Sequence, residues 1–340
     1  MDKKGVVFTF IVIALLSVVL IAFLLNISNK NSQAKIQDTN VKIETINSFT
    51  RTLNQELLPQ ALRSSSNRVV LSWLQYLDEV NIGLKNQSSG VFIIGNLNST
   101  LKEGMVSGSY RGIILNHMND ISTKSDYTLP SIFREIRVLG QNSGINFSYD
   151  DPKNYDFNIS LVNAWQINIT MQVSAYNVSD MKGETFWIFK TQNFSITLNV
   201  SNFREPFMLV FDDRNVTINR TRTTDFVNFN NFQNFYRGPE YREHSDAPSF
   251  LDRLQNITNA NAFGIETILD PTPAYFPNPP LGDTNTYSAV DFQYWRRMVP
   301  PAVQDDLGCA VDGFTDLYLN TTHLQYYSRK NDGNDFCPLV

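Results

Sequence analysis

Residues that build many active sites and metal centres are scarce in this chain, which has only 2 cysteines and 3 histidines among 340 residues. None of the histidines lies in a HExxH pair, and the sequence has no G-x-S-x-G elbow, P-loop or G-x-G-x-x-G pattern. The stretch Arg242–Asp246 places a base, an acid and a hydroxyl side by side. Catalytic triads are assembled from distant segments, so a solvated loop is the better interpretation. We therefore expect no enzymatic activity, no cofactor and no metal centre, with calcium at acidic doublets such as Asp150-Asp151 left open.

Charge is also low, which excludes a class of partner. Lys plus Arg number 28 against 33 Asp plus Glu, giving a net charge of −5 with 18% charged residues. Proteins that bind nucleic acid concentrate positive charge, so no nucleic-acid partner is expected. The hydrophobic content of 42%, with 24 Phe and 14 Tyr, is enough to build a core. The body of the chain is therefore predicted to fold.

What the chain does have is one long apolar run near its beginning. Val6–Leu25 is uncharged, and only Thr9 and Ser17 within it are polar. As a helix this run would be about 30 Å long, the thickness of a bilayer's hydrocarbon core. A cleaved secretory signal has a shorter apolar core and a small-residue cleavage site, which is missing here. The run therefore predicts a single transmembrane helix, with membrane lipid as its partner.

The residues before this run resemble the leader of type IV pilin-like proteins. Lys3-Lys4-Gly5 stands directly before the apolar segment. In that family a membrane peptidase cuts after the Gly on the cytoplasmic side, so the resemblance implies cleavage between Gly5 and Val6. Bacterial members carry Glu five residues into the mature chain, where this chain has Phe10, and archaeal relatives often lack it. A permanent signal anchor that is not cleaved is the alternative.

Asn-x-Ser/Thr sequons give the orientation of the anchor, because the flanking lysines are nearly balanced. The chain has 13 sequons among 37 Asn, where chance would give about five or six. N-glycans are added outside the cytoplasm, so the N-terminus is predicted inside and the body outside the cell membrane. The predicted glycosylation sites beyond the anchor are Asn86, Asn98, Asn146, Asn158, Asn168, Asn177, Asn193, Asn199, Asn215, Asn219, Asn256 and Asn320.

Three segments alternate strictly between apolar and polar residues, and this predicts strands with one buried face. They are residues 157–161, 165–175 and 193–200. Four sequon asparagines lie on the polar side of these strands, namely Asn158, Asn168, Asn193 and Asn199. Strands that follow one another with short turns favour an antiparallel sheet, covered on one face by the preceding helices.

Between the anchor and the strands the sequence predicts a helical stalk. Apolar residues recur at heptad spacing, with charged residues between them. Two interpretations stay open: the seam packs against copies of the chain, or the helix packs on its own globular domain. Pro59 is expected to kink or end this helix, and Tyr110–Ile121 is expected to form a short helix. The candidate self-association residues are Ile36, Ile43, Ile46, Leu53 and Leu57.

The C-terminal part is less regular. Phe226–Tyr236 repeats Phe every third residue with Asn between, which suits either a sugar-binding surface or a segment laid on the core. Pro271–Pro280 predicts a rigid extended loop. Cys309 and Cys337 are the only cysteines, and outside the cell we expect them to pair. A short helix at Pro248–Gln255 and a strand at Phe263–Leu269 are also predicted.

The fold class predicted is α+β: a transmembrane helix continuing into a helical stalk, then an antiparallel sheet packed on helices, then an irregular region closed by a disulfide. The boundaries are a leader at 1–5, the anchor at 6–25, the stalk at 26–82, a β-rich ectodomain at 83–225 and a C-terminal extension at 226–340. The whole resembles membrane-anchored surface proteins of small-genome archaea, on Asn158–Trp165, Ser249–Leu254 and Gly264–Glu266.

These features predict a glycosylated cell-surface protein with a structural or interaction role, such as a pilin-like filament subunit or minor pilin. Its partners would be copies of itself or other pilin-like subunits. The alternative is a tethered adhesin or receptor that binds glycans, peptides or a partner-cell surface through its ectodomain.

Overall fold

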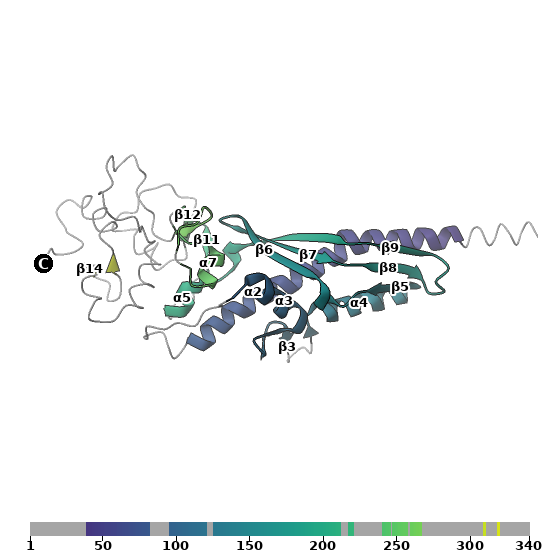
Figure 1. Ribbon diagram of the computed structural model, residues 1–340, viewed down its shortest axis with the longest axis horizontal. Coiled ribbons are helices and arrows are strands. Elements are labelled where there is room, and N and C mark those ends of the chain that lie inside the picture. Colours follow the sequence, from purple (N-terminus) through teal and green to yellow (C-terminus); the bar gives the residue numbers. More distant parts are fainter. Residues whose placement is uncertain are drawn as a thin grey trace, which may run out of the picture. The chain divides into compact units, whose positions relative to one another are not determined.

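The computed structural model describes residues 39–81, 95–120, 125–211, 217–220, 240–245, 247–257, 259–266, 309–310 and 318–319. The chain divides into two compact units. Unit 1 holds the residues up to Leu58, Glu135–Tyr149 and Ala175–Lys190; unit 2 holds Pro59–Arg134, Asp150–Ser174 and the residues from Thr191 onward. Figure 1 shows helices together with antiparallel strands, which confirms the predicted α+β class.

One helix runs from residue 39 to residue 81. It consists of residues 39–52, the π-helical turn η1 (Leu53–Leu57) and α2 (Leu58–Asn81). Of the two outcomes expected at Pro59, an end of the helix is wrong, because the helix continues through this residue. Proline lacks an N–H and its ring collides with the carbonyl four residues back. The helix widens just before it, so that the N–H of Leu58 bonds to the carbonyl of Leu53, five residues back. The π-type turn therefore shifts the backbone hydrogen bonds from four to five residues apart directly before Pro59. The helix continues beyond the proline.

Unit 1 is built on an antiparallel sheet of order β5-β8-β9. Its strands are β5 (Ile145–Tyr149), β8 (Tyr176–Asp180) and β9 (Phe186–Phe189). Residues 39–58 and the second part of α4 (Leu129–Asn142) complete the unit. The Tyr176 ring stacks on Phe189 with centroids 4.7 Å apart. The core of unit 1 therefore centres on aromatic side chains, joined by buried Ile46, Leu53, Ile145, Phe147 and Val178.

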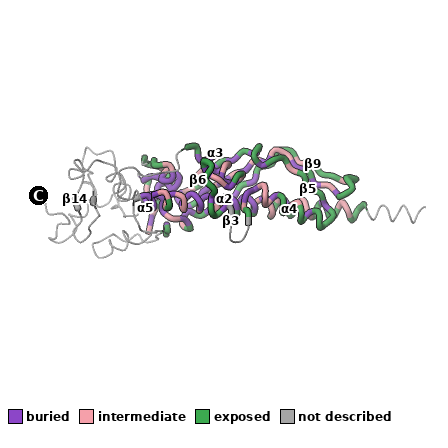
Figure 2. The backbone as a smooth tube through the Cα atoms, turned by 90° about the horizontal axis from the view of Figure 1, so that it is seen from below, coloured by how far each residue is buried: buried purple, intermediate pink, exposed green. Residues whose placement is uncertain are grey.

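Unit 2 contains the predicted alternating strands, in an antiparallel sheet of order β10-β7-β6. They are β6 (Asp156–Asn163), β7 (Gln166–Val173) and β10 (Gln192–Asn199). Figure 2 shows the buried stretches of the chain in purple. On these three strands Leu161 is half-buried and Val162 is 51% exposed, while the other apolar residues are buried. They are Phe157, Ile159, Ile167, Ile169, Met171, Val173, Phe194, Ile196 and Leu198. The prediction of strands with one buried and one wet face is confirmed.

Short elements surround this sheet. α3 (Leu97–Ser107) follows Asn96, whose side chain accepts from the N–H groups of Asn98 and Ser99. The shorter helices are η2 (Pro152–Asn154), η3 (Val200–Asn202), α5 (Pro206–Phe211) and α7 (Phe250–Leu254). Ser249 and Asp252 form a capping box at α7, so the predicted helix near Pro248–Gln255 is confirmed with shorter bounds.

The helix expected at Tyr110–Ile121 is wrong. β1 (Ser109–Tyr110) and β2 (Ile113–Ile114) form a hairpin there, and β3 (Asn119–Asp120) pairs with β4 (Ser125–Asp126). The hairpin turn is Arg111-Gly112, with φ of 50° and 78°. Two positive φ values in a two-residue loop match the twist of paired strands, and they are incompatible with a helix.

The remaining strands are two residues long except β12 (Glu240–Glu243), which pairs in parallel with β11 (Asn219–Arg220) and antiparallel with β13 (Ile265–Glu266). β13 covers two residues of the strand expected at Phe263–Leu269. β14 (Cys309–Ala310) pairs with β15 (Tyr318–Leu319). Cys337 lies outside the described residues, so the Cys309–Cys337 disulfide stays a prediction.

Several predicted features lie outside the described residues: the leader site at Gly5 and Val6, the Val6–Leu25 run, Ile36, Phe226–Tyr236 and Pro271–Pro280. In the part of the chain that the structure describes, no helix combines the length and apolar character needed to cross a bilayer.

Candidate functional site

The outward side chains of β6, β7 and β10 form what we call the polar face. Strand register places Asn158 opposite Thr170, which in turn lies opposite Ser195. One step along, Asn168 lies between Ser160 and Thr197. The face is thus a grid of amides and hydroxyls, with Asp156 its one carboxylate among these three strands. Such a surface offers hydrogen bonds but almost no charge.

Hydrogen bonds link neighbouring strands across the polar face. The Ser195 hydroxyl of β10 donates to Oδ1 of Asn168 on β7 at 2.6 Å, and within β7 Nδ2 of Asn168 donates to Oγ1 of Thr170 at 3.3 Å. Nε2 of Gln172 donates to Oδ1 of Asn193 at 3.1 Å. Cross-strand pairs of this kind hold the side chains in place, so the face is an ordered surface.

The structure exposes most of the predicted glycosylation sites that it describes. Asn98 and Asn168 are half-buried, and Asn86, Asn215 and Asn320 lie outside the described residues. Asn158, Asn168, Asn193 and Asn199 all lie on the polar face, as the alternation predicted. The exposed sequon asparagines are Asn146, Asn158, Asn177, Asn193, Asn199, Asn219 and Asn256.

Asn98 differs from the other sequon asparagines, because its side chain supports the fold. Its Oδ1 accepts the backbone N–H of Ile159 at 2.8 Å, and its Nδ2 donates to Oδ1 of Asn158 at 3.3 Å. β6 is an edge strand, so its outward backbone groups need partners. Asn98 supplies one from the first turn of α3 and thereby caps this edge. Sequence patterns alone did not separate Asn98 from the exposed sequons.

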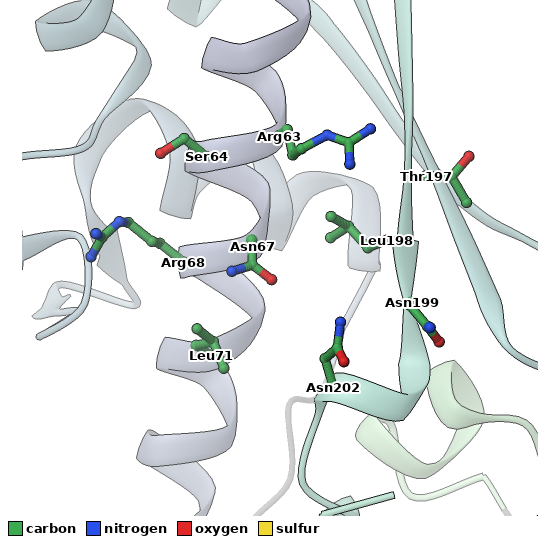
Figure 3. A pocket seen from close by; sticks show the side chains of 9 residues that line it. All are labelled: Arg63, Ser64, Asn67, Arg68, Leu71, Thr197, Leu198, Asn199 and Asn202. Atoms are coloured by element: carbon green, nitrogen blue, oxygen red, sulfur yellow. The ribbon is translucent and has the colours of Figure 1, made fainter. Parts of the chain in front are cut away.

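A groove of about 520 Å³ lies between α2 and the other edge strand, β10. Figure 3 shows Arg63 extended toward β10, while Arg68 points to the opposite side of the helix. Arg68 stacks 3.3 Å above the Tyr127 ring centroid and donates to the His117 carbonyl at 3.2 Å. Arg63 is thus the exposed cation of this groove. Its remaining lining residues are neutral: Ser64, Asn67, Leu71, Thr197, Leu198, Asn199 and Asn202.

The candidate self-association seam divides into core and surface positions. Ile46 is 1% exposed and Leu53 is fully buried inside unit 1, while Ile43 and Leu57 are half-buried. For Ile46 and Leu53 the structure favours the second interpretation, a helix packed on its own domain. These two side chains present no surface to another copy of the chain in this fold.

An apolar strand was missed by the sequence reasoning. Phe186, Trp187 and Ile188 of β9 are 57%, 38% and 64% exposed, and we call Phe186–Phe189 the apolar edge. β9 is the last strand of its sheet. Four consecutive apolar residues without alternation are the signal that could have identified it, because alternation is what hides apolar side chains on one face.

A buried ion pair in unit 2 was also missed. Nη1 of Arg253 donates to Oε1 of Glu205 at 3.1 Å, and both side chains are fully buried. Nη2 of Arg253 donates to the Ile265 carbonyl at 2.6 Å, and the guanidinium lies 5.1 Å from the Phe207 ring centroid. Burial raises the pKa of Glu205, opposed by Arg253 and by backbone N–H donors. Both side chains of the pair are enclosed, so a substrate cannot reach them. We therefore assign the pair a structural role in unit 2.

Other chemistry is limited among the described residues: no cluster of three or more His, Cys, Asp or Glu side chains is arranged to hold a metal ion. A scan against protein-family models finds no match, and searches of curated proteins and of solved structures also return none. The properties of the surfaces described above are therefore the basis for the function.

Proposed function

We propose that this protein is a glycosylated, single-pass cell-surface protein that acts by self-association, in the manner of a pilin-like subunit. The observation that carries the proposal is the placement of sequons on the polar face, where Asn158, Asn193 and Asn199 are exposed. Glycosylation needs a solvent-facing asparagine within a sequon, and it takes place outside the cytoplasm. Three exposed sequons on one sheet face suit a surface that carries sugar.

The hydrogen bonds at these asparagines are compatible with modification. Those at Asn193 and Asn199 use Oδ1, which accepts from Gln172 and from the N–H of Ser201, respectively. A glycan is attached at Nδ2, so its addition leaves both of these bonds in place. The polar face can therefore carry glycans without loss of its own order.

The anchor and the long helix support the membrane and assembly parts of the proposal. The Val6–Leu25 run has the length and composition of a bilayer span, and the described helix begins 14 residues after Leu25, at residue 39. Lys3-Lys4-Gly5 supports pilin-type processing. In this proposal the N-terminus lies in the cytoplasm, and the two units lie outside the cell.

Labelling of intact cells with a membrane-impermeant amine reagent tests the location. We expect Lys153, whose side chain is 67% exposed in unit 2, to be labelled; in an uncleaved chain, Lys3 and Lys4 should be labelled only after lysis. Labelling of Lys153 only after lysis would overturn the proposal. Sequencing of the mature N-terminus separates Val6, which means pilin-type cleavage, from Met1 or Asp2, which means an uncleaved anchor.

A tethered adhesin is the second candidate, and the groove beside β10 favours it. Arg63 and the amides of Asn67 and Asn202 suit hydroxyl or carboxylate groups of an acidic sugar. In a glycan-array experiment, Arg63→Ala should remove binding of acidic sugars. Arg134→Ala is the matched control, because Arg134 is also exposed but lies outside the groove. Equal binding by both variants would contradict this role.

A further inference from the structure

The apolar edge of unit 1 is the surface that the proposed function leaves unused. No described strand pairs with the outer side of β9. Phe186-Trp187-Ile188-Phe189 contains no charge, proline or glycine. Natural proteins blunt exposed sheet edges with charges, proline or covering elements, because an unprotected edge is a template for another strand.

The hydrogen bonds of the β8–β9 pair show which residues of β9 direct their backbone N–H and C=O groups away from β8. The N–H of Asp180 donates to the carbonyl of Thr185 at 3.0 Å, so Thr185 directs its backbone groups toward β8. In an antiparallel pair, alternate residues direct these groups to opposite sides. Phe186 and Ile188 therefore offer their N–H and C=O groups to an incoming strand.

We propose that β9 pairs antiparallel with β9 of a second copy of the chain, in a symmetric register centred on Trp187. Phe186 of one copy then lies opposite Ile188 of the other, so that outward backbone groups meet outward backbone groups. Glu184 of each copy lies opposite Lys190 of the other. This inference rests on the self-association in the proposed function and names the surface that carries it.

The charged residues next to β9 favour this register over the alternative registers of the same strand pair. Only shifts by two residues keep Phe186 and Ile188 hydrogen-bonded, so the competing registers centre on Phe186 or on Ile188. Centring on Phe186 places Glu184 of one copy opposite Ile188 of the other and forms no charge pair, because Lys182 lies in the turn between β8 and β9. Centring on Ile188 places Glu184 opposite Gln192 and forms no charge pair. The register centred on Trp187 forms two opposite-charge pairs.

Contacts within one copy are compatible with this pairing. Glu184 is 60% exposed and pairs with Lys42 of its own copy at 3.0 Å, so its carboxylate can meet a second cation at the edge. The Trp187 ring donates from Nε1 to Oδ1 of Asn47 at 3.0 Å and stays 38% exposed. Asn177 lies opposite Ile188 on β8, so a glycan there would project from the outer sheet face and leave the edge open.

Disulfide trapping of the full chain in detergent micelles tests the register. Residues on the symmetry axis form a non-hydrogen-bonded pair with Cα atoms about 4.5 Å apart, which a disulfide can bridge. Trp187→Cys should therefore form covalent dimers under mild oxidation, above the wild-type level. Thr185→Cys is the matched control, since its two copies lie about 13 Å apart along the strands. Equal trapping by both variants would overturn the register.

A charge exchange tests the same pairing without touching Trp187. Glu184→Lys alone and Lys190→Glu alone each create two like-charge pairs, and each should weaken the dimer about tenfold. The double variant restores both pairs and should recover wild-type dimerisation in analytical ultracentrifugation. Lys42→Met removes charge interactions within one copy, including the pair with Glu184, and should leave dimerisation unchanged. A double variant that dimerises no better than the single variants, or a wild-type chain that stays monomeric, would overturn the proposal.

Surface labelling of Lys153 is independent of these results, so failure of the register is distinguishable from failure of the proposed location.

Discussion

The sheet β10-β7-β6 of unit 2 and the sheet β5-β8-β9 of unit 1 differ in how their edge strands are protected. In unit 2, Asn98 caps the outer edge of β6 through the N–H of Ile159, and β10 borders the groove beside α2. In unit 1, the described residues leave the outer side of β9 uncovered, and its side chains are apolar. Edge strands that are covered or capped resist pairing, while apolar open edges promote it. These edges support the two proposals, that the sheet of unit 2 carries sugar and that the sheet of unit 1 pairs with a second copy.

The cores of the two units also differ, and the largest predicted effect follows from this. Unit 2 encloses the Arg253–Glu205 ion pair, whereas the core of unit 1 stacks aromatic rings. Arg253→Ala would leave the Glu205 carboxylate buried without its cation. We expect it to lower the free energy of unfolding by about 3–5 kcal/mol, measured by urea titration of the full chain.

An exposed pair in the same unit is the control for this experiment. Lys153 lies 2.9 Å from Asp151, with both side chains solvent-exposed. Lys153→Ala should leave the urea midpoint unchanged, because water replaces the lost partner. Similar losses for Arg253→Ala and Lys153→Ala would show that burial of the Glu205 pair does not organise unit 2.

The second prediction concerns a substitution that removes the hydrogen-bond cap from the edge strand β6. Asn98→Ala removes the acceptor of the Ile159 N–H and should destabilise the protein by about 1–2 kcal/mol. It should also increase self-association, because β6 then offers an unpaired edge. Asn98→Asp keeps an acceptor oxygen and removes the sequon, so it should retain most of the stability. If Asn98→Ala and Asn98→Asp have the same urea midpoint, the cap is not what protects β6.

The third prediction concerns pH and unit 1. Burial raises the pKa of Tyr176 from 10.0 to about 12, and its hydroxyl donates to Oδ1 of Asn54. The folded pKa lies above the unfolded one, so this contribution to stability is complete below pH 10.0 and is lost as pH rises toward about 12. Tyr176→Phe should lose about 1 kcal/mol near neutrality and flatten the alkaline decline. A steep decline that persists in Tyr176→Phe would place its cause elsewhere.

The smallest effect is expected on the polar face itself. Nδ2 of Asn98 lies 3.3 Å from Oδ1 of Asn158, so the two sequon side chains occupy one site. We expect glycopeptide analysis to find a glycan on Asn158 and none on Asn98 of the same molecule. Ser160→Ala removes the Asn158 sequon with little effect on folding, because residue 160 is on the partly exposed face. Molecules with glycans on both Asn98 and Asn158 would contradict this steric argument.

The sequence predicted those parts of the fold that depend on local periodicity. Alternation located β6, β7 and β10, and it placed Asn158, Asn193 and Asn199 on the exposed face. Features that depend on tertiary partners were missed. The π-type turn before Pro59 depends on a shifted backbone hydrogen bond, which helix propensity does not predict. The Arg253–Glu205 pair depends on a contact between residues that are distant in sequence. The same holds for the site: sequons are visible in sequence, but the role of Asn98 at the β6 edge appears only when α3 and β6 meet.

Glycopeptide mass spectrometry of the protein isolated from its native membranes tests whether the polar face lies outside the cell. We predict glycans on Asn158, Asn193 and Asn199 of the polar face, with Asn98 unmodified. The non-sequon Asn163, at the end of β6, serves as the internal control and should carry none. Recovery of Asn158, Asn193 and Asn199 entirely without sugar would contradict the assignment of this face to the cell exterior.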